Sequence, residues 1–214
     1  MYARPSQRNQ QMRNATLIVS TRILPALLVS ILAISSAWAG SNFEVLHAFA
    51  GGTDGAYPSS PLLDRSGNLY GATYDGGSLT GCNSYGCGAA FKLSEENGHW
   101  SEDVFYSFSA STDGDYPAPY GALAVDLHGN LYGIQQEAGD PTCNCGAIYQ
   151  LTRSAGVWTQ NTLHNFTGGG SGDGAYPSAG LVQDAHGNFY GTTEGGGVNM
   201  NGTIFELSPN PDGT

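Results

Sequence analysis

Residues 64–71 read Asp-Arg-Ser-Gly-Asn-Leu-Tyr-Gly, and the same pattern of Asp, Gly-Asn and Tyr-Gly returns at residues 126–133 and 184–191. In each copy two residues separate the Asp from the Gly-Asn pair, which is typical of a tight turn between two short strands. The glycine permits a left-handed backbone, and the Asp side chain is placed to accept turn N–H groups. The pattern therefore predicts the same β-hairpin three times.

Each hairpin belongs to a longer repeat, because Tyr70, Tyr132 and Tyr190 lie 62 and 58 residues apart. A D-G-x-Y-P connector precedes each hairpin, and a glycine-rich loop and a third strand follow it. A fourth strand begins at Trp100 or Trp158. Four short strands with a long return connection are typical of a propeller blade. The sequence predicts an all-β fold of β-propeller-like tandem repeats, with about three four-stranded blades.

The predicted repeat domain covers residues 40–214, with repeats at approximately 49–107, 108–165 and 166–214. Residues 43–49 match the fourth strand alone, so they are placed to complete the last blade and close a ring. Three blades are fewer than the usual number of about four to eight. The chain is therefore expected to form a larger ring as a homo-oligomer, to form an open arc, or to be a shortened member of a longer family. An open arc would leave unpaired edges, which favours self-association.

Residues 1–39 have the layout of a secretory signal peptide. Four arginines and no acid occur in residues 1–22, residues 23–34 form an apolar run, and Ala37-Trp38-Ala39 precedes Gly40. This order of basic, apolar and small residues is that of an export signal, and the apolar run is short for a membrane span. We expect a secreted protein, extracellular or periplasmic, with no membrane contact after cleavage.

The charge and the composition of the chain limit the classes of partner and fold that it favours. The chain carries a formal charge of −11, and residues 40–214 keep three basic residues against all eighteen acids, which makes −15. Such a chain does not favour nucleic acid, whose phosphates repel it. Thirty-two glycines and only 12% charged residues argue against a helical bundle.

The combined blocks D-G-x-Y-P, D-x-x-G-N-L-Y-G-T-T, G-G-G and G-T-I-F-E-L resemble the GloVer (Gloeobacter/Verrucomicrobia) tandem repeat. The resemblance covers residues 43–207. It implies an exported bacterial protein with a propeller-like fold, and it implies no activity, cofactor or catalytic residue. The chain departs from that family in its small number of repeats and in lacking a visible anchor.

The four cysteines form two local pairs, Cys82 with Cys87 and Cys143 with Cys145, in the loop before the third strand of their repeats. An even count in an exported chain favours disulfides. The alternative is a shared metal site, but no histidine lies beside either pair and the spacing is not a common one for zinc. The third repeat has no cysteine, so the bridges are additions to the fold.

The connectors offer a candidate calcium site. Asp113 and Asp115 are the only two neighbouring carboxylates in a D-G-x-Y-P connector, and calcium prefers oxygen ligands. The alternative is that Asp-Gly only sets a turn in each connector, which recurrence in every repeat favours. Calcium is thus a possible cofactor and the minority interpretation, and no other cofactor is expected.

The candidate binding residues are those that do not recur: Tyr74, Tyr85, Tyr120 and Glu137. Exposed tyrosine rings can pack on sugar faces, whereas recurring aromatics are expected to pack between blades. No catalytic motif is found, so the main hypothesis is a non-catalytic extracellular binding module for a glycan or a surface protein. The alternatives are an enzyme acting on polysaccharide, which needs paired carboxylates, and a structural piece of a larger surface assembly.

Overall fold

The computed structural model describes residues 43–79, 82, 84–110, 119–140, 142–169 and 172–209. The chain divides into two compact units, Met1–Val45 and Leu46–Thr214, and all the strands described belong to the second. Of the first unit only Phe43–Val45 is described, and these residues are exposed without regular secondary structure. Within the described ranges, no helix combines the length and hydropathy that a membrane span requires.

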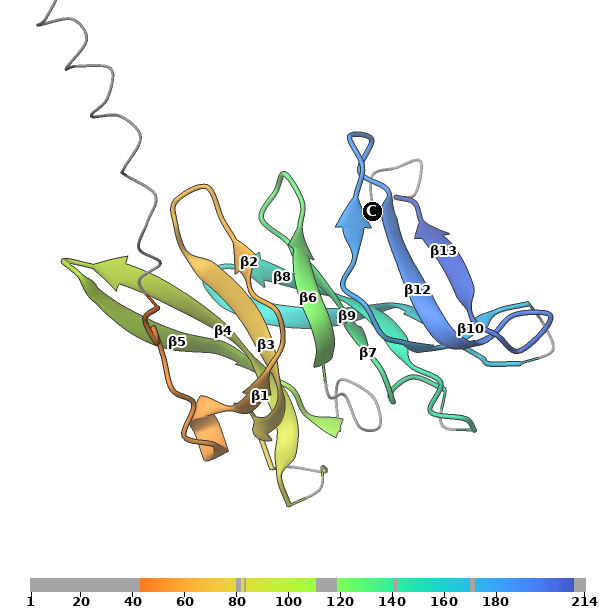
Figure 1. Ribbon diagram of the computed structural model, residues 1–214, viewed down its shortest axis with the longest axis horizontal. Helices are drawn as coiled ribbons and strands as arrows, with labels where there is room; N and C mark the ends of the chain where they lie inside the picture. Colours follow the sequence, from red (N-terminus) through yellow and green to blue (C-terminus); the bar gives the residue numbers. More distant parts are fainter. Residues whose placement is uncertain are drawn as a thin grey trace, which may run out of the picture. The chain divides into compact units, whose positions relative to one another are not determined.

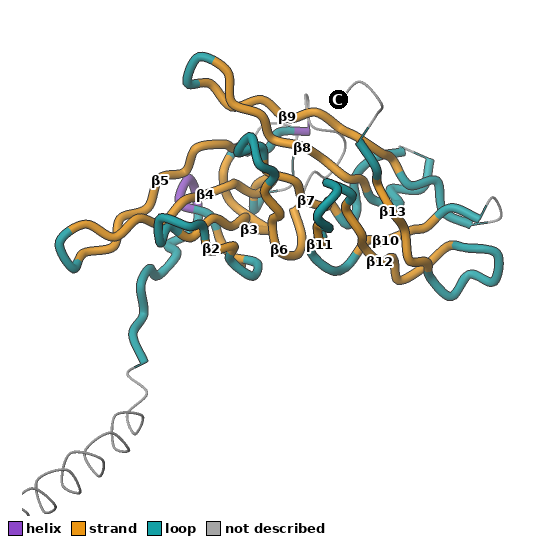
Figure 2. Tube along the Cα trace, turned by 90° about the horizontal axis from the view of Figure 1, so that it is seen from above, coloured by secondary structure: helices purple, strands orange, loops and turns teal. Residues whose placement is uncertain are grey.

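The second unit contains three antiparallel sheets, one from each predicted repeat, which we call blades 1, 2 and 3 (Figure 1). A single 3-10 turn, η2 (Gly52–Asp54), precedes the first strand. Strands and loops make up nearly all of the described chain (Figure 2). Blade 1 contains β1 (Ala56–Pro58), β2 (Leu62–Leu63), β3 (Leu69–Gly77), β4 (Gly86–Glu96) and β5 (His99–Ser107). Blade 2 contains β6 (Pro119–Val125), β7 (Leu131–Gln135), β8 (Ala147–Ser154) and β9 (Val157–Asn165). Blade 3 contains β10 (Gly174–Pro177), β11 (Val182–Gln183), β12 (Phe189–Gly196) and β13 (Thr203–Leu207). The predicted all-β, propeller-like repeat fold is confirmed.

The first strand is divided in two in blades 1 and 3, and it contains a register shift in blade 2. In blade 1, β1 and β2 pair with different parts of β3, and in blade 3, β10 and β11 pair with β12 in the same way. In blade 2, β6 is continuous, but its register shifts between Tyr120 and Ala124. Gly121 lies in this shift at a φ of +75°, and a Cβ there would come within 3.0 Å of the backbone of Ala179 and Gly180. The interruption therefore brings the backbones of blades 2 and 3 close together.

One alignment of the repeats is wrong. The D-G-x-Y-P motif matches Pro117 with Pro58, but Pro119 occupies that place in the sheet. Pro119 pairs with Gln135 as Pro58 pairs with Thr73 and Pro177 with Thr193. The alignment by the D-G-x-Y-P motif is wrong because, in repeat 2, the motif proline lies two residues before the proline that pairs in the sheet.

The predicted hairpin turns are confirmed in all three blades. The Asp126 carboxylate accepts the N–H groups of His128 and Asn130 at 2.8 and 2.9 Å, and the Asn130 side-chain amide at 2.8 Å. Asp64 and Asp184 make the same three bonds at 2.7 to 3.0 Å. One carboxylate thus satisfies the polar groups of each turn, as in an Asx turn.

The Tyr-Gly of each repeat fixes how the blades pack. Gly71 lies directly across from Phe91, and a Cβ on Gly71 would come within 2.5 Å of the Phe91 ring. The Phe91 ring therefore lies over the glycine and contacts Phe49 at 4.9 Å between ring centroids. The equivalent stacks are Gly133, Tyr149 and Phe108 in blade 2, and Gly191, Phe205 and Phe166 in blade 3.

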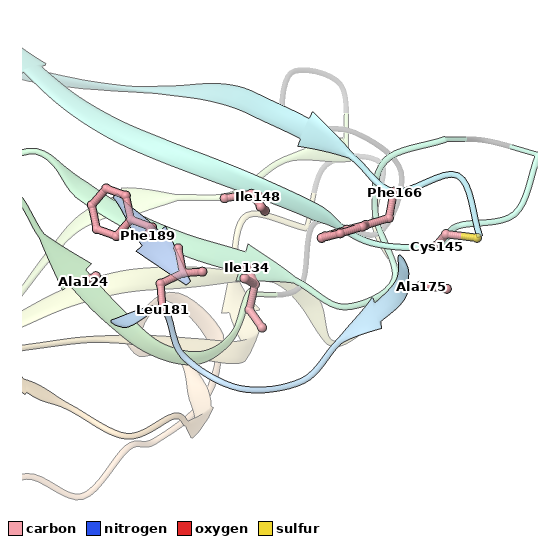
Figure 3. Close-up of a cluster of buried hydrophobic side chains, with 8 residues drawn as sticks. All are labelled: Ala124, Ile134, Cys145, Ile148, Phe166, Ala175, Leu181 and Phe189. Carbon is pink, nitrogen blue, oxygen red and sulfur yellow. The ribbon is translucent and has the colours of Figure 1, made fainter. Parts of the chain in front are cut away.

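Two buried clusters join neighbouring blades. One cluster combines residues of blades 1 and 2 around Phe108 and Tyr149, which are fully buried. The other combines blades 2 and 3, and Figure 3 shows it extending from Phe189 and Leu181 to Phe166 and Cys145. Buried aromatic side chains supply much of the stability of such a core.

Residues 43–49, predicted as a lone fourth strand, form no strand in the structure. The Phe49 ring still packs on Phe91 as its counterparts do, but the backbone of residues 43–49 does not pair with a neighbouring strand. The counterpart segments, β5 and β9, pair with the third strand of their own blades. Among the described residues no blade precedes Phe49, and β13 pairs only with β12. The ring contact is therefore retained without the strand that normally carries it.

Candidate functional site

Three of the four predicted binding residues come together where blades 1 and 2 meet. Tyr74 lies near the end of β3, Tyr120 lies on β6, and Glu137 follows β7 by two residues. The pKa of Tyr74 is raised, first by burial and then by the charges of Glu137, Asp75 and Tyr120. These groups therefore share one electrostatic environment. We call Tyr74, Tyr120 and Glu137 the tyrosine cluster.

The tyrosine cluster does not recur in the other blades. By sheet register Tyr120 takes the place of Ser59 and Ser178, which follow the equivalent prolines. Tyr74 takes the place of Gln136 and Glu194, which follow Gln135 and Thr193. Tyr120 is 41% exposed, and Tyr74 is half-buried. Two tyrosines thus stand where the rest of the fold uses small or polar side chains.

A pocket of about 230 Å³ is lined by Glu137 of the cluster, by Cys143 and Asn144 of the same blade 2 loop, and by Tyr176 of β10 in blade 3. Its volume is below the range of about 300–1,000 Å³ that encloses small-molecule ligands. Asn144 Oδ1 is buried and has no hydrogen-bond partner among the described residues. A buried acceptor without a donor is unfavourable, so the pocket is suited to a ligand that brings a hydroxyl or amide group.

The loop that forms this pocket is held by local bonds. The Asp140 carbonyl accepts the N–H of Asn144 at 2.7 Å, and Gly146 donates to the Ala138 carbonyl at 2.7 Å. The pKa of Asp140 is lowered by the hydroxyl and N–H of Thr142, both of which donate to its carboxylate. The loop therefore presents Glu137 from a backbone held at both ends.

The disulfide partners lie as the sequence predicted. Cys143 is joined to Cys145, and Cys82 to Cys87, and the described chain contains no free cysteine. The Cys145 carbonyl accepts the Tyr176 N–H at 2.7 Å, which connects the Cys143–Cys145 bridge to blade 3. The bridge thus contributes both to the pocket lining and to its support.

Of the predicted site residues that remain, the structure describes only Tyr85. Tyr85 lies just before β4 and is 69% exposed. It is not among the groups whose charges raise the pKa of Tyr74. Asp113 and Asp115, the candidate calcium ligands, lie outside the described residues.

The structure brings together a second group that the sequence did not indicate: His47, Asp54 and Glu102, which we call the His47 triad. His47 Nε2 lies 3.1 Å from Asp54 Oδ1 and 3.6 Å from Glu102 Oε2. The side chains are 23%, 24% and 10% exposed, respectively. His47 and Asp54 precede the first blade, whereas Glu102 lies on β5.

The two carboxylates of the triad differ in their affinity for protons. Burial raises the pKa of Glu102 to about 8, and a hydrogen bond with Asp54 adds to the shift. The same bond lowers the pKa of Asp54, and the Ala50 N–H, which also donates to Asp54, adds to this. At neutral pH Glu102 is therefore protonated, and its carboxyl O–H donates a hydrogen bond to the Asp54 carboxylate.

Sequence reasoning missed the triad because its members are 7 and 48 residues apart and belong to separate motifs. One difference between the repeats points to the triad. Glu102 pairs with Leu93 across the sheet, at the position where Gln160 pairs with Leu151 in blade 2. A carboxylate that replaces an amide at one repeat position indicates a local specialisation.

A fold of three propeller-like blades, joined by aromatic stacks, defines a β-propeller-like repeat protein. The family model described as the Gloeobacter/Verrucomicrobia repeat matches residues 33–214, and the chain belongs to this family. The resemblance noted from the sequence is thereby confirmed.

Comparison with curated proteins gives no match. Among solved structures, one of a protein described as a candidate gluconolactonase is similar at 20% identity, with a TM-score of 0.37. The match covers 72% of this chain and 48% of that one, so the chain spans about half the length of that structure.

Proposed function

We propose that the protein is an exported, non-catalytic binding module whose ligand is a glycan. The observation that carries the proposal is the placement of Tyr74 and Tyr120 on β3 and β6, which pack against each other, with Glu137 near enough to raise the pKa of Tyr74 and also lining a small polar pocket. Tyrosine rings offer an apolar face and a polar hydroxyl, which suits a sugar ring with C–H groups on its face and hydroxyls at its edge. Glu137 and Asn144 Oδ1 supply acceptors for those hydroxyls.

The pocket size favours recognition of part of a polymer. A volume of about 230 Å³ has room for one sugar ring or a similar group, with the rest of the chain passing over Tyr120. Shallow sites of this kind bind weakly, with Kd values on the order of 0.1–1 mM, or about 4–5.5 kcal/mol. Repetition of the polymer would compensate through multivalent contact.

Export is part of the proposal. The signal-peptide layout of residues 1–39 and the two disulfides both support a compartment outside the cytoplasm. Amino-terminal sequencing of protein recovered from an exporting bacterial host should begin at Gly40. Retention of residues 1–39 would contradict the predicted cleavage.

Hydrolysis of a polysaccharide is less well supported. The Asp54 and Glu102 carboxylates have well-separated pKa values, but they hydrogen-bond to each other. Glycosidases need carboxyl groups about 5 Å or more apart, with the scissile bond between them. We therefore expect no release of reducing ends from polysaccharides.

The binding test titrates soluble bacterial and plant polysaccharides into the exported protein and measures the heat of binding by calorimetry. Tyr120→Ser installs the side chain of the other two blades and should weaken binding at least tenfold while leaving the melting temperature unchanged. Tyr85→Ala removes an exposed tyrosine outside the cluster and should leave binding unchanged. Equal losses in both variants would reject the cluster as the site. A surface protein as ligand would give no glycan signal and would reject the glycan.

Self-association is the remaining partner prediction. Among the described residues β13 pairs on one side only, and an open strand edge can accept a strand from a second copy. Light scattering on the exported protein should reveal a dimer or a larger species if blades are pooled. A monomer at all concentrations would reject this prediction and leave the binding proposal intact.

A further inference from the structure

The His47 triad has a donor set that is not explained by the fold. One imidazole nitrogen and two carboxylates offer ligand atoms that all lie within 4.8 Å of one another. Glu102 is nine-tenths buried, and its Oε1 has no hydrogen-bond partner among the described residues; Gln160 Oε1, at the equivalent place of blade 2, also has none, but there the oxygen belongs to a neutral amide. A buried carboxylate oxygen without a donor is costly, unless a cation supplies the missing contact.

The spacing of the donors fits one small cation. A tetrahedral ion with bonds of about 2.0–2.1 Å holds its ligands roughly 3.3–3.4 Å apart. His47 Nε2 lies 3.1 Å from Asp54 Oδ1 and 3.6 Å from Glu102 Oε2, on either side of that value. The Ala50 N–H donates to Asp54 Oδ2, so Oδ1 remains directed toward the imidazole.

The other blades show which part of the triad the fold requires. Between blades 2 and 3, His164 of β9 and Asp173 of the connector before β10 form the same pair at 3.4 Å, and Asp173 accepts the Thr167 N–H as Asp54 accepts that of Ala50. The pair thus recurs as a clamp on the connector. The carboxylate does not recur: blade 2 has Gln160 at this place, and no described residue of blade 3 occupies it.

We propose that His47, Asp54 and Glu102 bind a divalent transition-metal ion, with Zn²⁺ as the best-matched ion and water as the fourth ligand. Imidazole nitrogen suits Zn²⁺, whereas Ca²⁺ and Mg²⁺ prefer oxygen ligands alone. The partial exposure of His47 and Asp54 leaves an entry path and room for the water.

The ion would attach residues 46–54, which precede β1, to blade 1. Residues 46–50 have no strand hydrogen bonds, and this segment is held by the Phe49–Phe91 contact and by the triad. His47 and Asp54 lie on this segment and its η2 turn, whereas Glu102 lies on β5. A metal that bridges them replaces the missing ladder with three coordinate bonds, and metal binding of this kind adds to folding stability.

The test uses the full exported protein, stripped with EDTA and titrated with Zn²⁺, Co²⁺, Ca²⁺ and Mg²⁺. We expect one Zn²⁺ per chain, and a Tm increase of roughly 5–10 °C at a Zn²⁺ concentration about 100-fold above Kd. Co²⁺ should give the visible absorption of a tetrahedral site. Absence of Zn²⁺ binding, or equal stabilisation by Ca²⁺, would overturn the proposal and leave a proton-sharing carboxylate pair.

Two variants locate the ion. Glu102→Gln installs the blade 2 side chain with nearly the same shape, and should lower Zn²⁺ affinity by more than the roughly 10–100-fold that loss of an outer-shell partner costs. His164→Gln breaks the clamp between blades 2 and 3 and should leave the affinity unchanged. An unchanged affinity in Glu102→Gln, or an equal loss in His164→Gln, would place the ion elsewhere.

Discussion

The hairpin turns and the connector clamps recur in the same chain, yet they behave differently. The three turns at Asp64, Asp126 and Asp184 make the same hydrogen bonds to within 0.3 Å. The clamps at His47 and His164 share their His–Asp pair, but in the described part of the chain only the first has a second carboxylate beside it. A feature that every blade repeats serves the fold, whereas a feature added in one blade is a candidate for function.

The strongest test of this distinction removes a recurring aromatic. Phe108 is fully buried and packs edge-to-face on Tyr149 at 5.2 Å. Phe108→Ala should lower the free energy of unfolding by about 3–5 kcal/mol, because it leaves a cavity between blades. Urea unfolding of the exported protein measures the loss. Phe49→Ala should cost less, since Phe49 is only half-buried; a larger loss there would mean that the N-terminal contact dominates stability.

A recurring turn should have the next largest effect. Asp126→Ala removes the acceptor of three turn donors and of the Tyr132 hydroxyl at 3.0 Å. The free energy of unfolding should fall by about 1–3 kcal/mol, because the donors are left without their partner. Asp64→Ala is the matched control: no tyrosine hydroxyl bond to Asp64 is seen in the described chain, and its loss should be smaller. Equal losses would mean that the tyrosine bond contributes nothing.

The disulfides are present in two blades only, so they should matter less than the turns. Each bridge closes a short segment, with separations of 5 and 2 residues. Short loops restrict the unfolded chain little, so Cys82→Ser with Cys87→Ser should cost about 2 kcal/mol or less. The equivalent change at Cys143 and Cys145 should cost less still, and it should also weaken ligand binding at the pocket. Unfolding on reduction would show that the bridges are required for the fold.

The sequence predicted most of the features that every repeat contains, and little of how residues from separate repeats come together. The D-x-x-G-N turn is a local pattern, so its hydrogen bonds and its strand pairing follow from neighbouring residues. The cysteine pairs are local for the same reason. Tyr74, Tyr120 and Glu137 were each identified because they do not recur, but their convergence depends on how blades 1 and 2 pack. The strand expected at 43–49 failed because a strand needs a partner, which a sequence pattern does not guarantee.

Sheet register explains the other failures. The place of Pro119 was hidden because the connector motif of repeat 2 lies two residues away from its place in the sheet. Glu102 and Asp103 are neighbours on β5, and because adjacent strand residues point to opposite faces, Glu102 is largely buried whereas Asp103 is exposed. The partner of Glu102 came from the connector, outside the strand pattern altogether.

The smallest expected effect is a dependence of stability on acid, and it distinguishes the turns from one another. At Asp184 burial opposes ionisation, but the bonds from Asn188, His186 and Tyr190 outweigh it and lower the pKa to about 2. A folded pKa below the unfolded value gives stability that is present above about pH 4 and is lost as the pH falls toward 2. Asp184→Asn should flatten the dependence of the urea midpoint on pH in this range, while Glu194→Gln, at an exposed residue of the same blade, should not. If both variants keep the full slope, the acid sensitivity comes from Asp126 and Asp64, and the third turn is the least important of the three for folding.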